Sequence, residues 1–145
     1  MKKVLACLLM LALALTMTAA LAEEEKTYVI GMSQCNLGEP WRVAMNDQIA
    51  AAAAEYPMFE IIYADAAQDN SKQIADIENF MQMGVDLIIA SPNEATPLTD
   101  VIERAYNSGI PVILLDRKID GDSYTQFIGA VQKYGPVTLL SPEEV

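Results

Sequence analysis

The sequence contains no histidine and only two cysteines, Cys7 and Cys35. The lack of histidine excludes the commonest zinc and copper ligand sets and the usual Ser-His and Cys-His nucleophile arrangements, although carboxylate chemistry remains possible. Cys7 lies in the apolar start of the chain, so the remainder keeps one cysteine and cannot form an internal disulfide. We therefore expect a fold that depends on its hydrophobic core, with Cys35 as a small buried residue.

Basic residues are also scarce. Nine lysines and arginines stand against twenty aspartates and glutamates, and the formal net charge is −11 over 145 residues. Such an acidic surface repels phosphate backbones and anionic headgroups, which disfavours binding to nucleic acid or to a membrane surface. A neutral ligand is unaffected by this balance, and the length suits one small domain.

The first residues are typical of a secretory signal peptide. Lys2 and Lys3 precede an almost unbroken apolar run over residues 4–19, and the small-x-small segment 20–22 comes directly before three glutamates. We expect cleavage after Ala22 and an exported protein of the periplasm or cell envelope. The lack of a basic flank disfavours a membrane anchor. Cys7 follows only three apolar residues, too few for the apolar core of a lipoprotein signal.

Apolar, β-rich runs alternate with segments of helical periodicity along the rest of the chain. We expect strands at residues 27–32, 59–64, 85–90, 110–115 and 126–129. Strands that alternate with helices at this spacing form right-handed crossovers and a parallel sheet with helices on both faces. The sequence therefore predicts the α/β class with a doubly wound parallel sheet.

Three segments between these strands show the three- and four-residue spacing of amphipathic helices. The first begins at Pro40, which suits the first helical position, and ends before Pro57. Its apolar positions predict one buried face, formed by Trp41, Met45, Ile49, Ala52, Ala53 and Tyr56. The second follows possible caps at residues 69–71 and stops at Gly84, with an inward stripe of Ile74, Ile77, Phe80 and Met81. The third is expected to have Thr96 as its cap and Pro97 as its first residue.

Polar residues gather after the ends of the predicted strands, where open parallel sheets bind ligands. The candidate ligand-binding residues are Gln34, Glu39, Trp41, Arg42, Asp65, Ser91, Asp116 and Arg117. Carboxylates accept from hydroxyls, a guanidinium donates in a fixed fork, and an indole covers the apolar face of a sugar ring. We expect a polyhydroxylated ligand, with no catalytic residue, metal or cofactor.

Each candidate also has a plainer interpretation. Asp116 and Arg117 can form an exposed ion pair of little energetic value. Trp41 begins the apolar stripe of its helix and can belong to the core. Asp65 and Ser91 can cap turns.

Five sequence segments in order resemble the periplasmic sugar-binding proteins of the ribose and galactose type. The most specific is Gly109-Ile110-Pro111-Val112 leading into Leu115-Asp116-Arg117, and the others are residues 28–34, 41–42, 65–66 and 84–92. Ser33-Gln34 with Trp41-Arg42 is most similar to the galactofuranose-binding branch. The resemblance covers about residues 26–130.

This resemblance implies the N-terminal lobe of a type I periplasmic binding protein, with about five strands in the order 2-1-3-4-5. Such a receptor closes two lobes around a monosaccharide and delivers it to the permease of an ABC importer or to a chemoreceptor. By family pattern, Asp116 and Arg117 clasp sugar hydroxyls, and Trp41 and Arg42 supply the aromatic contact and the arginine. Arg42 disfavours ribose itself, because many ribose receptors carry a second aromatic there. The matches at Gln34, Glu39, Asp65 and Ser91 are weaker.

The sequence departs from the family pattern after Ala130. The family continues with an Asp-Asn pair, a helix and a second lobe, whereas this chain reads through residues 131–145 and stops. We expect a sugar-binding lobe over residues 23–130, a divergent tail over residues 131–145 and no second lobe, as in a truncated gene product. We also expect a monomer.

Other folds with a similar element order fit less well. A phosphoacceptor receiver domain needs an acidic pair after the first strand, where this chain has Ser33-Gln34. A Rossmann enzyme needs G-x-G-x-x-G at that point. The signal peptide argues against a sugar-responsive repressor. A sensor lobe of a chemotaxis or signalling system remains an open alternative to transport.

Overall fold

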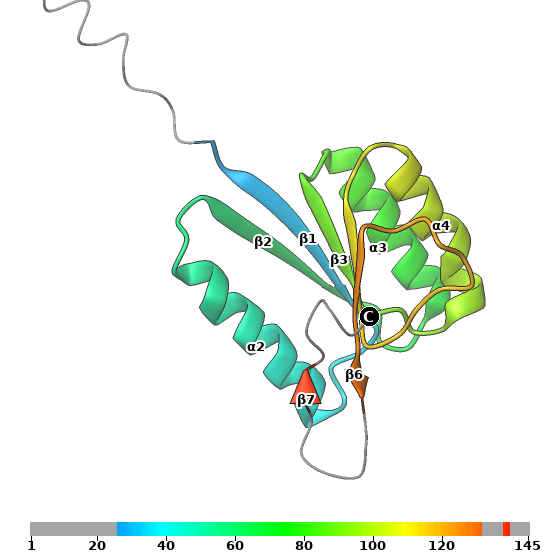
Figure 1. The fold of residues 1–145 in the computed structure, drawn as a ribbon, viewed down its shortest axis with the longest axis horizontal. Helices are drawn as coiled ribbons and strands as arrows, with labels where there is room; N and C mark the ends of the chain where they lie inside the picture. Colours follow the sequence, from blue (N-terminus) through cyan, green and yellow to red (C-terminus); the bar gives the residue numbers. More distant parts are fainter. Residues whose placement is uncertain (1–25, 132–137, 140–145) are drawn as a thin grey trace, which may run out of the picture.

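The computed structural model describes residues 26–131 and 138–139 (Figure 1). The expected signal peptide, residues 1–22, lies outside the described residues, as does most of the expected tail. Two short strands are described at its start and within it, β6 (Ala130–Val131) at the junction with the tail and β7 (Thr138–Leu139), and they pair antiparallel.

The described chain forms a five-stranded parallel sheet in the order β2-β1-β3-β4-β5, which confirms the expected fold class and strand order. The strands are β1 (Tyr28–Gln34), β2 (Phe59–Asp65), β3 (Leu87–Ala90), β4 (Val112–Leu115) and β5 (Gln126–Ile128). The order reverses at β1, which lies between β2 and β3. Ligand sites of such sheets lie outside the carboxyl ends of the strands at this reversal.

Strand boundaries differ from the expected ones by about two residues. β1 includes Ser33 and Gln34, because Ser33 pairs with Ala90 of β3 and Gln34 with Asp65 of β2. β3 and β4 begin later than expected because Val85 N and Ile110 N still donate to carbonyls of the preceding helices. The longer β1 therefore places Gln34 inside the sheet.

Helices lie on both sides of the sheet: α3 (Asn70–Met83) and α4 (Ala95–Asn107) on one face, α2 (Pro40–Ala54) on the other (Figure 1). The alternation of side chains along β1 shows the division. Gly31 faces Phe80 of α3, whereas Gln34 contacts Met45 and Asn46 of α2.

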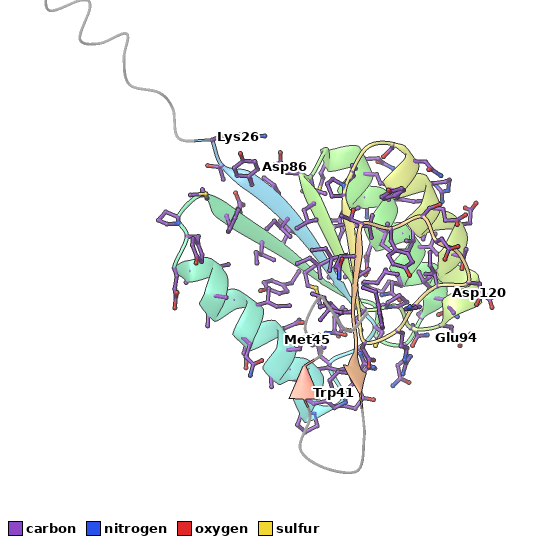
Figure 2. The ribbon with its side chains drawn as sticks, in the orientation of Figure 1. Lys26, Trp41, Met45, Asp86, Glu94 and Asp120 are labelled. Atoms are coloured by element: carbon purple, nitrogen blue, oxygen red, sulfur yellow. The ribbon has the colours of Figure 1, made fainter. Side chains whose placement is uncertain are left out.

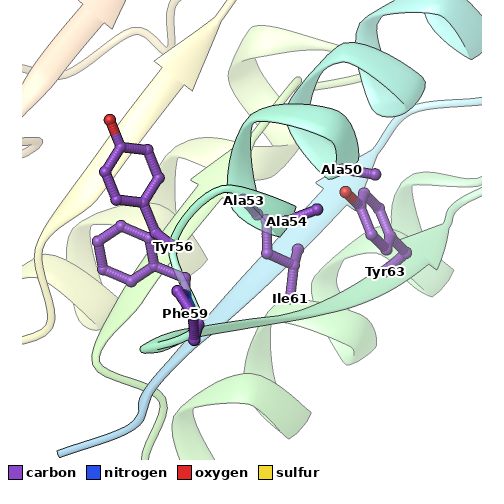
Figure 3. Close-up of a pocket in the computed structure, with 8 residues that line it drawn as sticks. Ala50, Ala53, Ala54, Tyr56, Phe59, Ile61 and Tyr63 are labelled. Carbon is purple, nitrogen blue, oxygen red and sulfur yellow. The ribbon is translucent and has the colours of Figure 1, made fainter.

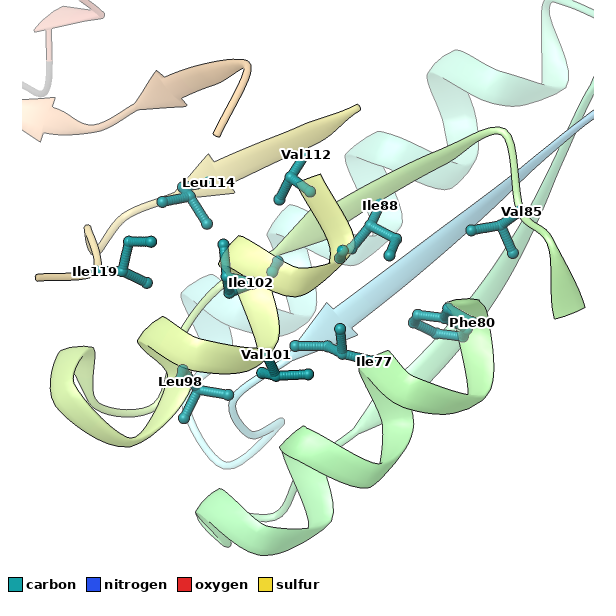
Figure 4. Packing of buried hydrophobic residues seen from close by; sticks show 12 residues of the cluster. Ile77, Phe80, Val85, Ile88, Leu98, Val101, Ile102, Val112, Leu114 and Ile119 are labelled. Atoms are coloured by element: carbon teal, nitrogen blue, oxygen red, sulfur yellow. The ribbon is translucent and has the colours of Figure 1, made fainter. Parts of the chain in front are cut away.

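The hydrophobic core lies between the sheet and the α3–α4 pair (Figure 4). Ile77 and Phe80 of α3 are buried, and Ile74 and Met81 are partly buried against them, so the stripe expected for this helix is confirmed. The other core members are Val85, Ile88, Ala90, Leu98, Val101, Ile102, Ala105, Val112, Leu114 and Ile119. Each large aliphatic side chain buried in this way stabilises the fold by about 1.5–3 kcal/mol.

The opposite face of the sheet is less completely covered. On β3 and β4, Ile88, Ala90, Val112 and Leu114 are fully buried toward α3 and α4. Their neighbours Leu87, Ile89, Ile113 and Leu115 point to the α2 side and are only half-buried. The unbroken apolar runs of these strands therefore have one fully buried face toward α3 and α4 and one half-buried face toward α2.

The ends of α3 follow local sequence rules. Asp69 is the N-cap, and its Oδ1 accepts from Ser71 N at 2.8 Å and Lys72 N at 3.1 Å. Gly84 ends the helix at φ 68°, a left-handed conformation that favours glycine. Both expectations are confirmed.

The start of α4 was expected two residues too late. The helix begins at Ala95, with Glu94 at the N-cap and no side-chain cap. The Thr96 hydroxyl instead donates to Asp120 Oδ2 at 2.6 Å. Pro97 lies within the first turn, where its missing N–H has no intrahelical partner to lose.

The buried face expected for α2 is wrong in its central point. Pro40 does begin the helix, but its buried residue is Arg42, while Trp41, Ala52 and Tyr56 are exposed and Met45, Ile49 and Ala53 are half-buried. The cause is local: α2 covers edge strand β2 with small alanines, and polar acceptors at the strand ends hold Arg42. The spacing of apolar residues does not predict such a polar contact.

None of the described helices is long and apolar enough to span a membrane.

Candidate functional site

The candidate site lies at the carboxyl edge of the sheet, where β1, β3 and β4 end beside the start of α2. Figure 2 shows Trp41 at this end of α2, with Lys26 and Asp86 at the opposite end of the sheet. The parallel arrangement brings these chain segments together because all the strands end on the same side. Seven of the eight candidate residues lie at this edge in mutual contact.

Arg42 is the centre of the group, and its side chain is only 2% exposed. Its Nη1 donates to Gln34 Oε1 at 3.1 Å and to Ser91 Oγ at 3.0 Å. Its Nη2 donates to Asp116 Oδ2 at 3.2 Å. A buried guanidinium is tolerated only when it is paired and hydrogen-bonded, and here its acceptors come from the ends of three strands.

Glu39 adds a second carboxylate to this guanidinium. Its Oε2 lies 3.0 Å from Arg42 Nε, one helical turn away. Among the described residues, neither atom has a hydrogen-bond partner of good geometry, although both atoms are buried. The contact is therefore electrostatic rather than a directed hydrogen bond.

Trp41 is not a core residue, since 46% of it is exposed. The guanidinium carbon of Arg42 lies 4.1 Å from the centroid of the indole ring, within the range of a cation–π contact. Arg42 therefore supports the indole, and the remaining exposed part of the ring faces solvent beside the polar cluster.

Asp116 and Arg117 follow β4 and join the same cluster. Asp116 has φ 67°, a left-handed conformation that is uncommon for a non-glycine residue, and its N–H donates to Ile128 O at 2.9 Å. Arg117 Nε lies 3.7 Å from Asp116 Oδ2, and Arg117 Nη1 donates to Asn93 O. The pair is thus tied to the end of β5 and to the loop after β3, and is not an isolated surface ion pair.

Gln34 and Ser91 are buried and face Arg42 rather than solvent. Gln34 Oε1 also accepts from Cys35 N at 3.2 Å, and its Nε2 donates to Asn46 Oδ1 at 3.1 Å. Cys35 itself is fully buried, as expected. Gln34 and Ser91 therefore orient the guanidinium of Arg42 from the buried side of the cluster.

Asp65 is the candidate that stands apart from the cluster. Its Oδ1 accepts from Ala67 N at 2.9 Å and so closes a turn after β2. Ala67 and Gln68, two and three positions after Asp65, both have positive φ, which this turn stabilises. The structure gives Asp65 a turn-capping contact and none of the contacts with Arg42.

Residues 30–134 match the family described as periplasmic binding protein domain. The chain belongs to this family, in its sugar-binding, ribose and galactofuranose type. It is a family of binding proteins rather than enzymes.

Two curated relatives illustrate the similarity. The ribose import binding protein of Bacillus subtilis is 32% identical over 96 residues, which cover 66% of this chain and 31% of that protein. The galactofuranose-binding protein of Escherichia coli is 36% identical over 91 residues, covering 63% of this chain and 28% of that protein. The chain thus spans about a third of the length of the curated relatives that it matches.

Solved structures of the periplasmic binding protein family agree with this assignment. The fructose-binding periplasmic domain of a hybrid two-component system is 50% identical, with a TM-score of 0.69 over 71% of this chain and 34% of that one. An ABC transporter solute-binding protein from Bacillus halodurans, with bound myo-inositol, is 37% identical, with a TM-score of 0.70 over 76% of this chain and 38% of that one.

The sequence interpretation of this periplasmic binding protein missed one buried polar side chain near the site. Gln73 of α3 is fully buried and hydrogen-bonds to the ends of two strand segments. A signal for it was present, because Gln73 occupies the inward stripe of α3 four residues before Ile77. A polar residue at a stripe position indicates a buried hydrogen-bonding role.

An apolar hollow of about 280 Å³ lies away from this cluster, between α2 and β2 (Figure 3). Its lining consists of Ala50, Ala53, Ala54, Tyr56, Pro57, Phe59, Ile61 and Tyr63. None of the candidate residues lines it. Among the described residues, no group of histidine, cysteine and carboxylate side chains is placed to hold a metal ion.

Proposed function

We propose that the carboxyl edge of this sheet binds a neutral monosaccharide or a related cyclic polyol, as the N-terminal lobe of a receptor for an ABC importer. The observation that carries this proposal is the buried Arg42, which orients Asp116 and Gln34 beside the half-exposed indole of Trp41. The known sugar-binding character of the family agrees with it.

The hydrogen-bonding groups that the cluster leaves available suit hydroxyl groups. Asp116 uses Oδ2 for Arg42 and Arg117, so its Oδ1 remains to accept from a hydroxyl. Arg117 has a side chain that is 48% exposed and N–H groups beyond those given to Asn93. A sugar offers donors and acceptors to both, and its apolar C–H face packs on an indole.

The charge of the cluster favours a neutral ligand over an anionic one. Two carboxylates, Glu39 and Asp116, balance two guanidiniums, Arg42 and Arg117. Arg42 directs its N–H groups to protein acceptors and is closed to solvent. A sugar phosphate or sugar acid would need an unpaired cation, which this arrangement does not provide.

Names of relatives support import as the role of the whole protein. One relative is a ribose import binding protein and one structural match is an ABC transporter solute-binding protein. We propose the importer permease as the partner and a monomeric receptor as the working form.

Sensing is the second candidate, and one specific observation favours it. The structural match at 50% identity is a periplasmic domain of a hybrid two-component system that binds fructose. In that role the same polyol site would report ligand to a signalling partner instead of a permease.

We further propose that residues 1–22 direct export and that the mature domain covers residues 23–130. The basic start, apolar run and Ala20-Leu21-Ala22 segment support cleavage after Ala22. The family match over residues 30–134 supports the domain range. The mass of the exported chain tests the cleavage: a mass beginning at Glu23 is expected, and a lipid adduct on Cys7 contradicts it.

Direct titration tests the ligand class. The purified chain is titrated into the millimolar range with D-fructose, D-ribose, D-xylose and myo-inositol, and with ribose 5-phosphate as the anionic control. The fluorescence of Trp41, the one tryptophan of the chain, reports binding. We expect at least one neutral polyol to bind and to raise the melting temperature, since a ligand specific for the folded state stabilises it. Binding of the phosphate alone contradicts the proposal.

A further inference from the structure

A buried glutamine, Gln73, stands behind the proposed polyol site without reaching its surface. It lies near the start of α3 and is 0% exposed, on the helix face that continues with Ile77 and Phe80. Burial of an amide is unfavourable unless its donors and acceptor are paired. The contacts of Gln73 therefore explain why a polar residue occupies this core position.

The Gln73 amide is fully hydrogen-bonded. Its Nε2 donates to Ser33 Oγ at 3.2 Å and to Ser91 O at 2.9 Å, and its Oε1 accepts from Asn93 N at 2.8 Å. Ser33 belongs to the end of β1, whereas Ser91 and Asn93 follow β3. One side chain thus joins the end of β1 to residues 91–93, which we call the β3 loop.

The β3 loop holds both arginines of the site. Ser91 Oγ accepts from Arg42 Nη1 at 3.0 Å, and Asn93 O accepts from Arg117 Nη1. The Asn93 side chain also donates to Gln68 O at 3.2 Å and Asn70 Oδ1 at 2.7 Å, which ties the loop to the start of α3. A shift of the loop therefore moves the acceptors of two guanidiniums at once.

We propose that Gln73 is a positioning residue that fixes the β3 loop and, through Ser91 and Asn93, sets the directions of Arg42 and Arg117. It has no contact of its own with a ligand at the sheet edge. The inference rests on the proposed polyol site for its functional meaning, but the loop geometry can be measured without any ligand.

The test compares Gln73→Met with Ile77→Val in the full chain. Methionine has nearly the length of glutamine and stays buried, but it removes all the bonds of the amide and leaves Asn93 N without its acceptor. Ile77→Val lowers global stability from the same helix face without touching the β3 loop. The two variants separate a local positioning role from a general loss of core packing.

Amide hydrogen exchange at Asn93, followed by NMR, is the first readout. The Ile88 N–H is the internal reference, because it lies in β3 outside the loop and donates to the backbone Pro111 O at 3.0 Å. We expect Gln73→Met to speed exchange at Asn93 by about 10-fold or more relative to Ile88, because a lost hydrogen bond of about 1.4 kcal/mol corresponds to a factor of ten. Ile77→Val is expected to leave this ratio unchanged. An unchanged ratio in Gln73→Met overturns the inference.

Polyol affinity, from Trp41 fluorescence with the same four neutral probes, is the second readout. We expect Gln73→Met to weaken binding by about 10- to 100-fold and Ile77→Val to leave it near the original value. Equal losses in both variants overturn the positioning role, because general destabilisation then explains them. If the unchanged chain binds none of the probes, the proposed function fails, and exchange at Asn93 still decides whether Gln73 fixes the loop.

A second variant covers the case in which Gln73→Met does not fold. Gln73→Glu keeps an oxygen that accepts from Asn93 N, but it loses the donors to Ser33 and Ser91. We expect exchange at Asn93 to stay slow in this variant while polyol binding weakens. Fast exchange at both Asn93 and Ile88, as in general unfolding, contradicts the inference.

Discussion

Arg42 Nη2 lies 3.2 Å from Asp116 Oδ2, so the buried start of α2 is joined to the end of β4 across 74 positions of sequence. The contact fixes the carboxylate of Asp116, a residue with φ 67°. It also gives the guanidinium a counter-charge at the carboxyl edge of the sheet, where the polyol site is proposed.

Removal of this counter-charge is expected to affect both stability and binding. Asp116→Asn leaves Arg42 buried with a weaker partner, and we expect a loss of about 1–3 kcal/mol of unfolding free energy in a denaturant melt, together with weaker polyol binding. Asp100→Asn is the matched control, because Asp100 pairs with Arg104 on the exposed surface of α4 at 2.8 Å. That change should cost at most about 1 kcal/mol. Equal losses in the two variants would contradict the buried role of Arg42.

Arg117 is expected to separate binding from stability. Its side chain is 48% exposed, so Arg117→Ala should change the unfolding free energy by no more than about 1 kcal/mol. Loss of a charge-assisted hydrogen bond to a sugar should weaken binding by about 10- to 100-fold. The neighbouring Lys118→Ala, which removes an exposed cation above Phe127, is the control for charge alone. Calorimetric titration that finds unchanged affinity for Arg117→Ala would remove this residue from the site.

Trp41 should behave as a surface contact and not as core. Because it is 46% exposed, Trp41→Ala is expected to lower stability by less than the 3–5 kcal/mol, approximately, that a buried tryptophan costs. Polyol binding should fall strongly in Trp41→Ala and less in Trp41→Phe, which keeps an aromatic face. A core-sized loss of stability in a denaturant melt, with affinity retained, would support instead the alternative interpretation of Trp41 as a core residue.

Much of the fold could be predicted from the sequence, because hydrophobic period and glycine or aspartate caps act locally. Gly84 and Asp69 set the ends of α3 through their own backbone and side chain, and the predicted boundaries there are correct. The α2 face failed for the opposite reason. Arg42 is buried by acceptors 49 and 74 positions away, and no local pattern contains that information.

The same distinction applies to the candidate site. Strand-end position and family resemblance predict Arg42, Asp116 and Arg117 as parts of one site, and the structure places them together. Asp65 occupies an equivalent strand end, but its own turn takes its carboxylate. Gln73 was missed because a helix stripe was read for apolar residues only.

Close packing of β1 on α3 predicts a further sensitive position. A Cβ on Gly31 would come within 2.5 Å of the Phe80 ring, so Gly31→Ala must displace a buried side chain. We expect a loss of about 1–3 kcal/mol, typical of overpacking. The double variant Gly31→Ala with Phe80→Leu should recover part of this loss. A double variant that loses more unfolding free energy than the two single variants together would exclude this clash as the cause.

Acid stability should depend in part on Asp86 at the amino end of β3. Its Oδ2 accepts from Val29 N at 2.9 Å and its Oδ1 pairs with Lys26 at 3.1 Å, and these contacts lower the pKa of Asp86. A lowered pKa contributes stability that is present above the unfolded value, about 3.9, and is lost as the pH falls through the folded value. Asp86→Asn should therefore be less stable at neutral pH and should converge with the original chain in acid. Parallel melts from pH 7 to pH 2 check this, and a constant gap would contradict it.

The uneven attachment of α2 determines how a bound sugar would change the local opening of this helix. This helix contacts the edge strand β2 through small alanine side chains, and Arg42 attaches it to the sheet at one end. Elements with few buried apolar contacts open first in native-state fluctuations. A ligand that engages Trp41 and the Arg42 cluster would close that low-energy opening, so occupancy at the sheet edge should slow amide exchange along the whole helix, as far as Ala54. On the proposed function, the binding of a small polyol would thus make one helix of this lobe more rigid.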